Sequence, residues 1–268
     1  MSVRLGMRFD GFDPVGETIA VSAQAEEAGA DTIWMAEHLG YREAAVSCMA
    51  FALSTHRAMV IPTAVMPYIW HPMPTAMQFA TMAEAAPGRV GICVSVGNLL
   101  NLRESGVPHP EKPVRVIREY VEALRALWNG ETVDQEGLIW QLRGARLAFK
   151  PPKTIPIFVA STGPQVLGLA GRIADGVLYS GGLSLASIKK CADFADIGNL
   201  ADIVAGTGST TTGHSKFEIN GTTGTGSANL RILGLYNEPK NAYGTNGVLE
   251  AVIWEHELIG HDQGTAGV

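Results

Sequence analysis

The chain repeats one order of local signals: a helix-like segment, a glycine, a short apolar run, then abrupt polar residues. In the clearest copy, a helical pattern over 15–28 ends at Gly29, the β-prone run 32–36 follows, and Glu37 and His38 come directly after it. This order is typical of alternating strands and helices. The carboxyl ends of the strands carry the chemistry in such proteins, so both residues are candidate catalytic groups. The alternative is that they only begin a solvated loop.

The same order continues to about residue 190. Residues 130–149 form an exception, because they are typical of an inserted hairpin with a turn near Gly137. Six strand–helix units with right-handed crossovers predict a TIM (β/α)₈-type barrel, which needs two more units to be complete. The predicted strands are 3–9, 32–36, 58–65, 89–96, 156–160 and 177–180, and the predicted helices are 15–28, 43–55, 72–85, 112–128 and 163–173.

The composition changes near residue 195, where Gly, Thr and Ser become frequent and helical periodicity is lost. Two β-like runs follow, at 230–236 and 248–254. We therefore predict two parts, a barrel portion over 1–194 and an atypical tail over 195–268 that contains an antiparallel β-hairpin made from the two runs. On this interpretation the barrel is incomplete, with six βα units, and the β-like tail is unrelated to it.

Bulk properties narrow the function classes. The formal net charge is −6 and there is no basic cluster, which predicts no nucleic-acid partner. No apolar run approaches the roughly 18 residues that span a bilayer, and the first residues lack the apolar core of a secretory signal. The three cysteines are odd in number and far apart, which favours buried thiols over disulfides. We expect a cytoplasmic protein with no membrane partner.

No metal site is predicted. The run H-E-L-I-G-H at 256–261 is similar to the zinc-binding H-E-x-x-H helix, but its second histidine comes five residues after the first. At 100° per residue the two side chains would lie about 140° apart around a helix, away from a shared face.

Several motifs in a fixed order carry a resemblance to a known family. Through them, residues 3–190 resemble the bacterial luciferase-like monooxygenase superfamily, in particular its deazaflavin (coenzyme F420)-dependent branch, which includes methylenetetrahydromethanopterin reductase. The motifs are W-M-A-E-H at 34–38, I-P-T-A-V-M-P-Y at 61–68, H-P-M-P-T-A at 71–76, P-G-R-V-G-I-C-V-S-V-G-N at 87–98, R-E-Y-V-E-A-L-R-A-L-W-N-G-E at 118–131, I-P-I-F-V-A-S-T-G-P-Q at 155–165 and G-R-I-A-D-G-V at 171–177.

The resemblance implies a (β/α)₈ barrel with an insertion and an oxidoreductase activity. The enzyme would transfer a hydride between F420, or alternatively the flavin FMN, and a small organic substrate. It also implies a homodimer as a common assembly. The substrate is not specified, because specificity in this superfamily lies in loops and in the C-terminal units. The alternative hypothesis, suggested by the tail, is a truncated or fused, inactive barrel fragment with a non-enzymatic, virion-like tail.

The resemblance also implies roles for particular residues. Glu37 and His38 would lie near the reactive C5 of the cofactor ring, where they would position the substrate or move a proton. A non-prolyl cis peptide between Ala64 and Val65 would form a bulge under that ring, although an ordinary trans strand end is the alternative.

Two further segments would hold the rest of the cofactor. Ser95, Gly97 and Asn98 would lie beside the ring or its ribityl chain, although a tight turn alone also explains Gly97. The strand-to-helix turn at 160–163 would bind the cofactor phosphate through its amides, with a glycine after the sixth strand close by. The residues assigned to this phosphate site are Ala160, Ser161, Thr162, Gly163 and Gly181. Trp70 and His71 either cover the substrate or simply pack.

Overall fold

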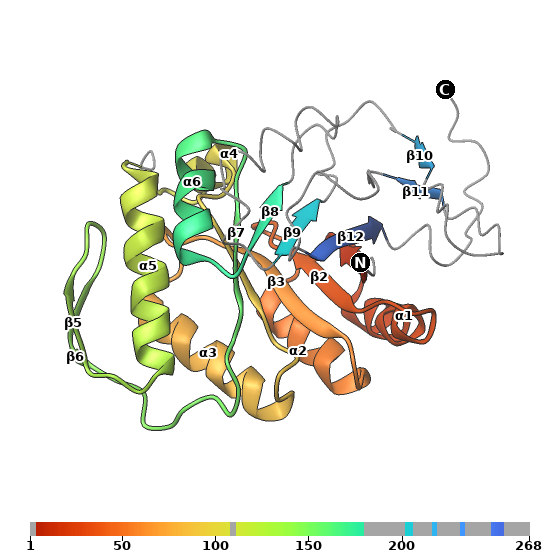
Figure 1. The fold of residues 1–268 in the computed structure, drawn as a ribbon, viewed down its shortest axis with the longest axis horizontal. Coiled ribbons are helices and arrows are strands. Elements are labelled where there is room, and N and C mark those ends of the chain that lie inside the picture. The colour runs from red at the N-terminus through yellow and green to blue at the C-terminus, as the bar shows by residue number, and fades with distance from the viewer. Residues whose placement is uncertain are drawn as a thin grey trace.

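The computed structural model describes residues 4–107 and 111–179, and the strands at 202–205, 216–218, 231–233 and 248–254. Its centre is a closed barrel of parallel strands in the order β1-β12-β9-β8-β7-β4-β3-β2, with the described helices on the side of the first six strands (Figure 1). Gly181 and the 256–261 motif lie outside the described residues.

The first six barrel strands lie where the sequence predicts them, and helices alternate with them, which confirms the predicted (β/α)₈-type architecture. The largest difference between a predicted and an observed strand start is at β4, which was predicted from residue 89 and begins at Ile92. The short helix α4 (Leu99–Glu104) was not predicted. The strands are β1 (Arg4–Phe9), β2 (Thr32–Ala36), β3 (Met59–Val65), β4 (Ile92–Ser95), β7 (Ile157–Ala160) and β8 (Gly176–Tyr179), and the other helices are α1 (Val15–Glu27), α2 (Ala44–Ser54), α3 (Pro72–Ala85), α5 (Pro113–Trp128) and α6 (Pro164–Ile173).

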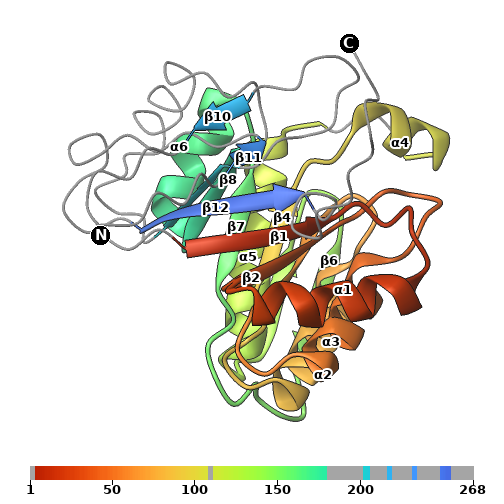
Figure 2. The ribbon, with the colours of Figure 1, turned by 90° about the vertical axis from the view of Figure 1, so that its right-hand side faces the viewer.

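Two strands from the C-terminal part complete the ring. β9 (Asp202–Ala205) pairs with β8 and β12, and β12 (Val248–Trp254) pairs with β9 and β1, all in parallel. Figure 2 shows β1 and β12 side by side. Closure removes the two open edges that a six-stranded sheet would leave at β1 and β8.

The predicted hairpin between 230–236 and 248–254 is wrong, because β12 uses both of its edges in the barrel. β11 (Arg231–Leu233) instead pairs antiparallel with β10 (Lys216–Glu218). A chain division at residue 194 is not tested by these pairings and stays a prediction.

The inserted hairpin consists of β5 (Val133–Glu136) and β6 (Gln141–Ala145), and it lies outside the barrel against α5 (Figure 1). The buried carboxylate of Glu119 on α5 holds it there, since its Oε2 accepts a hydrogen bond from the Leu138 amide at 2.8 Å. The backbone oxygen of Glu119 also accepts one from Gln135 Nε2 at 3.1 Å.

Successive strand residues face opposite sides of the barrel wall. Outward-facing residues such as Met7, Ile33 and Val94 join the large core beneath the helices. The inward-facing residues form a second buried cluster, in which the rings of Trp34 and Phe158 meet edge to face with centroids 5.2 Å apart. The barrel interior is therefore a packed core, and any ligand space lies above it, at the ends of the strands.

Candidate functional site at the strand ends

The strand order brings the predicted site residues into one neighbourhood. β2, β3, β4 and β7 are consecutive in the ring, and their carboxyl ends carry the candidate residues. These residues are Glu37 and His38 after β2, Ala64 and Val65 in β3, Ser95, Gly97 and Asn98 at the end of β4, and Ala160, Ser161, Thr162 and Gly163 at the end of β7.

Small side chains line the inner face just above the packed interior. Ser95 is aligned with Ala160, one inward position beyond the aligned pair Cys93 and Phe158. Ala64 is half-buried and packs against the same inner cluster. The inner face above Trp34 and Phe158 is thus built from small residues at these positions.

β3 bulges close to the predicted place. The non-prolyl cis peptide joins Thr63 and Ala64, one residue earlier than the predicted Ala64–Val65 bond. Thr63 is aligned with Cys93 and Val65 with Val94, so Ala64 is the extra residue on β3. The bulge therefore centres on Ala64 rather than on the bond that follows it.

The turn after β4 requires glycine at position 97. Gly97 has a φ of +92°, and a Cβ there would overlap the side chain of Met66. Its amide donates a hydrogen bond to Ser95 Oγ at 3.3 Å. The tight-turn explanation therefore holds for Gly97, and the same turn brings the exposed Asn98 to the mouth.

His38 is held in one tautomer. Its Nδ1 lies 2.7 Å from the backbone oxygen of Asp10, at the end of β1. A carbonyl oxygen can only accept, so Nδ1 carries a hydrogen and donates it. In the neutral ring Nε2 therefore has a free lone pair, which is the form that accepts a proton. The ring packs against Phe12, with centroids 5.1 Å apart.

Glu37 faces the helix that follows it. Its Oε2 accepts a hydrogen bond from the Ala44 amide at 2.8 Å, at the start of α2, and the Trp70 indole donates a second bond. Burial raises the pKa of Glu37 and the nearby Glu43 raises it further, while the bonds from Ala44 and Trp70 act in the opposite direction. Glu37 thus joins β2, α2 and the loop after β3.

The turn after β7 leaves the start of α6 without a side-chain cap. Ser161 Oγ accepts the Gly163 amide at 3.0 Å, and Pro164 occupies the first helical position. The starts of α1 and α5 also lack a side-chain cap, whereas those of α2 and α3 are capped by Glu43 and His71. Uncapped amides in a first helical turn are suited to an anion, which fits a cofactor phosphate.

Sequence reasoning missed the contribution of β1. Met7 and Phe9 face the outer core, so Arg8 faces inward, aligned with Trp34. Burial lowers the pKa of Arg8 to about 10 against the opposite effect of Asp10. Alternation along β1 was the available signal, because a charged residue at an inward position of a barrel strand is unusual.

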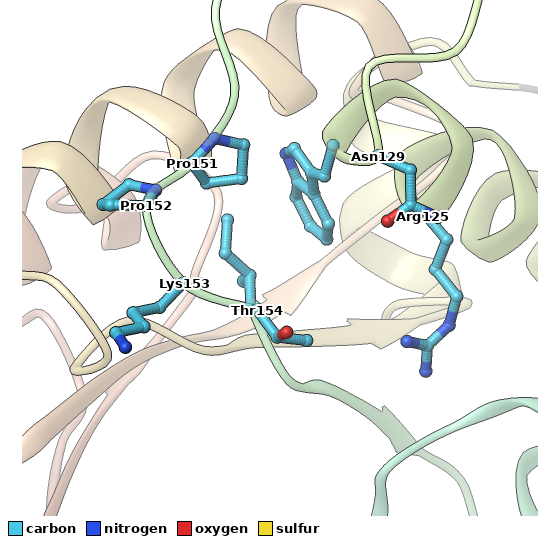
Figure 3. Close-up of a pocket in the computed structure, with 8 residues that line it drawn as sticks. Arg125, Asn129, Pro151, Pro152, Lys153 and Thr154 are labelled. Carbon is cyan, nitrogen blue, oxygen red and sulfur yellow. The ribbon is translucent and has the colours of Figure 1, made fainter.

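A pocket of about 370 Å³ lies at the other end of the barrel, where α5 ends and the segment before β7 begins. Figure 3 shows Arg125 and Lys153 on opposite sides of it. Arg125 pairs with Asp175 at 2.9 Å and donates to the Ile173 carbonyl, so it fastens α5 to the segment between α6 and β8. Conserved chemistry in barrels is at the opposite face, so this pocket is not the candidate site. Across the described residues, no His, Cys, Asp and Glu cluster could hold a metal ion.

Comparison with known proteins agrees with this geometry. The family model described as luciferase-like monooxygenase matches residues 4–196. The chain belongs to this family. The predicted family is therefore confirmed. In a separate finding, no helix within the described residues is long and apolar enough to cross a membrane.

Relatives in the family include F420-dependent enzymes. The F420-dependent glucose-6-phosphate dehydrogenase of Beutenbergia cavernae is 33% identical over 177 residues, which cover 62% of this chain and 53% of the relative. The chain thus spans about half the length of this curated relative.

Two solved structures share the fold. The coenzyme F420-dependent tetrahydromethanopterin reductase of Methanopyrus kandleri superimposes with a TM-score of 0.68 at 24% identity, covering 76% of this chain and 65% of the other. The oxygenating constituent of 3,6-diketocamphane monooxygenase from Pseudomonas putida, in complex with FMN, gives 0.63 at 19% identity, covering 76% and 67%.

Proposed function

We propose that this protein is an oxidoreductase that transfers a hydride between F420, with FMN as the alternative, and a small organic substrate. The observation that carries the proposal is His38, fixed with a free Nε2 lone pair beside a barrel mouth lined by small residues. The F420-dependent relatives favour the deazaflavin over the flavin.

The residues at the strand ends fit the cofactor. When bound, its ring accepts or supplies the hydride. Ala64, Ser95 and Ala160 would lie against the ring, and Asn98 would lie near its polar edge. The turn at Ser161 to Gly163 and the uncapped start of α6 would hold the phosphate.

We assign the proton to His38. For a substrate alcohol oxidised to a carbonyl, His38 Nε2 would accept the hydroxyl proton, while the bound cofactor would supply the hydride acceptor. In the reverse reaction, the substrate carbonyl would regain the hydride and the proton. The hydrogen bond from Nδ1 to Asp10 keeps the ring in the tautomer that this step needs.

Glu37, predicted as catalytic together with His38, is proposed to act by positioning. Its carboxylate is engaged by Ala44 and Trp70, so it fixes the turn that carries His38.

A titration of the purified chain with F420 and, separately, with FMN tests the proposal, with cofactor fluorescence as the signal. We expect saturable micromolar binding of F420 and weaker binding of FMN. A folded sample that binds neither cofactor would contradict the proposal, and tighter binding of FMN would move the assignment to a flavin enzyme.

The alternative hypothesis, an inactive fragment with a virion-like tail, is not favoured. It assumed that the C-terminal segment leaves the barrel open, whereas β9 and β12 occupy the seventh and eighth strand positions.

A homodimer is the proposed assembly. α2 and α3 expose three large apolar side chains, Val46 (66%), Leu53 (65%) and Met77 (50%), which a second copy of the chain could cover. Sedimentation of the wild type as a dimer, and of a Val46→Glu, Leu53→Glu variant as a monomer, would support a second copy of the chain on this face. A wild-type monomer at micromolar concentration would contradict it.

The remaining predictions on partners and location stay proposals. The net charge of −6 supports the absence of a nucleic-acid partner. The buried free thiols Cys48 and Cys93 support a reducing cytoplasm.

A further inference from the structure

A pocket of about 510 Å³ lies outside the barrel, between the loop after β3 and the tip of the β5–β6 hairpin. Its volume is within the range of small-molecule sites, about 300–1,000 Å³. Most of its lining is apolar or aromatic, from Tyr68 and Ile69 on the loop and Leu138, Ile139 and Trp140 on the hairpin. None of these residues belongs to the strand-end site.

The hairpin wall of this pocket is preformed. The buried Glu119 carboxylate holds the Leu138 amide at 2.8 Å. The Trp140 ring meets Tyr120 edge to face at 5.4 Å, and its indole donates to Gln135 Oε1 at 3.3 Å. A wall fixed by a buried charge and an aromatic pair binds a ligand without first having to be ordered, which saves conformational entropy.

The loop wall is fixed as well. The Tyr68 hydroxyl donates to the backbone oxygen of Glu111 at 2.9 Å. The amides of Ile69 and Trp70 both bond to the Met66 carbonyl at 2.9 Å, which closes the loop into a tight turn. Both walls therefore hold their aromatic side chains in place with their hydrogen-bonding groups already satisfied.

Two polar groups determine which ligands the pocket favours. His71 Nδ1 accepts the Met73 amide at 3.2 Å, so the neutral ring carries its hydrogen on Nε2 and has a donor left for a ligand. Among the described residues that line the pocket, Glu111 has the one carboxylate, and there is no lysine or arginine. A negative rim disfavours anionic ligands.

We propose that this pocket is a second ligand site, which binds a planar aromatic molecule that is neutral or cationic and has an acceptor for His71. The proposal goes beyond the proposed oxidoreductase function, because none of the residues that line this pocket is assigned above to the cofactor or to proton transfer.

Nile red, a neutral planar aromatic dye that fluoresces in apolar surroundings, is the probe. We expect saturable binding of one molecule per chain, unchanged when the strand-end site is filled with excess F420 or FMN. The anionic dye 8-anilinonaphthalene-1-sulfonate should bind at least about tenfold more weakly, because of the charge on Glu111.

Ile139→Glu is the decisive variant, since Ile139 is 43% exposed and its replacement leaves the core intact. A second carboxylate at the rim should weaken Nile red binding by about tenfold or more. Val15→Glu is the matched control, because Val15 on α1 is an apolar residue with a similar exposed fraction (41%), and the dye affinity should not change.

Three outcomes would overturn the proposal. The first is no saturable Nile red binding, and the second is equal loss with both variants, which would indicate general surface adsorption. The third is displacement of the dye by cofactor with no effect of Ile139→Glu, which would place the dye in the barrel mouth.

Discussion

His38 shows how one backbone contact decides the chemistry of a side chain. The Asp10 carbonyl fixes its tautomer, and this contact joins the ends of the consecutive strands β1 and β2. The sequence indicated His38 by its place after a buried strand. It could not indicate which ring nitrogen is free, because that depends on the path of the chain after β1.

His38→Ala should lower the rate of hydride transfer from an alcohol substrate by about 10²–10⁴-fold, the usual contribution of a positioned acid or base. Cofactor affinity should change much less. His56→Ala is the control, since that histidine is exposed. A purely structural role would instead show up as an equal loss of cofactor binding and an unchanged pH profile of the residual rate.

Glu37 provides a test through stability. Because burial raises its pKa in the folded chain, its ionisation favours the unfolded state as the pH rises past the ordinary value of 4.5. Glu37→Gln keeps an acceptor for Ala44 and removes the charge. The variant should therefore be at least as stable as the wild type at pH 7, with the difference shrinking below pH 4.5, in denaturant unfolding. A variant that is less stable at pH 7 but not at pH 4 would contradict this account.

At the scale of elements, local periodicity predicted most of the first 179 residues. α5 is the clearest case, because its buried residues repeat every three or four positions. β9 and β12 could not be placed in the same way. Their partners are the open edges of β8 and β1, and such pairing between distant segments leaves no local pattern in the sequence.

The hairpin gives the prediction at this scale. Glu119→Ala should leave the Leu138 amide without its partner and cost about 1–3 kcal/mol of unfolding free energy. Hydrogen exchange at Leu138 should become faster. Glu122→Ala on the exposed side of α5 is the matched control and should have little effect. Equal effects of the two changes would mean that Glu119 does not hold the hairpin.

For the whole molecule, Glu26 links α1 to the start of β3. Burial raises its pKa, but the amides of Ala58, His56 and Arg57 and the charge of Arg57 outweigh this, and the net pKa is lowered from 4.5. A lowered carboxyl pKa contributes stability above the unfolded value, which is lost as the pH falls through the folded value.

Glu26→Gln should therefore lower the thermal midpoint at pH 7, and the difference from wild type should shrink as the pH falls below 4.5. Glu27→Gln, at the exposed neighbouring position, should leave the thermal midpoint unchanged both at pH 7 and below pH 4.5. If Glu26→Gln lowered the thermal midpoint by the same amount at every pH, the charge of Glu26 would not be the source of the stability.

A crystal structure of the chain with the cofactor that binds more tightly tests the central claim most directly. The account predicts the ring above Ala64 and Ala160, its reactive edge toward His38 Nε2, and its phosphate at the start of α6. Cofactor bound elsewhere, or a ring placed beyond the reach of His38, would contradict the assignment of the strand ends as the site of hydride transfer.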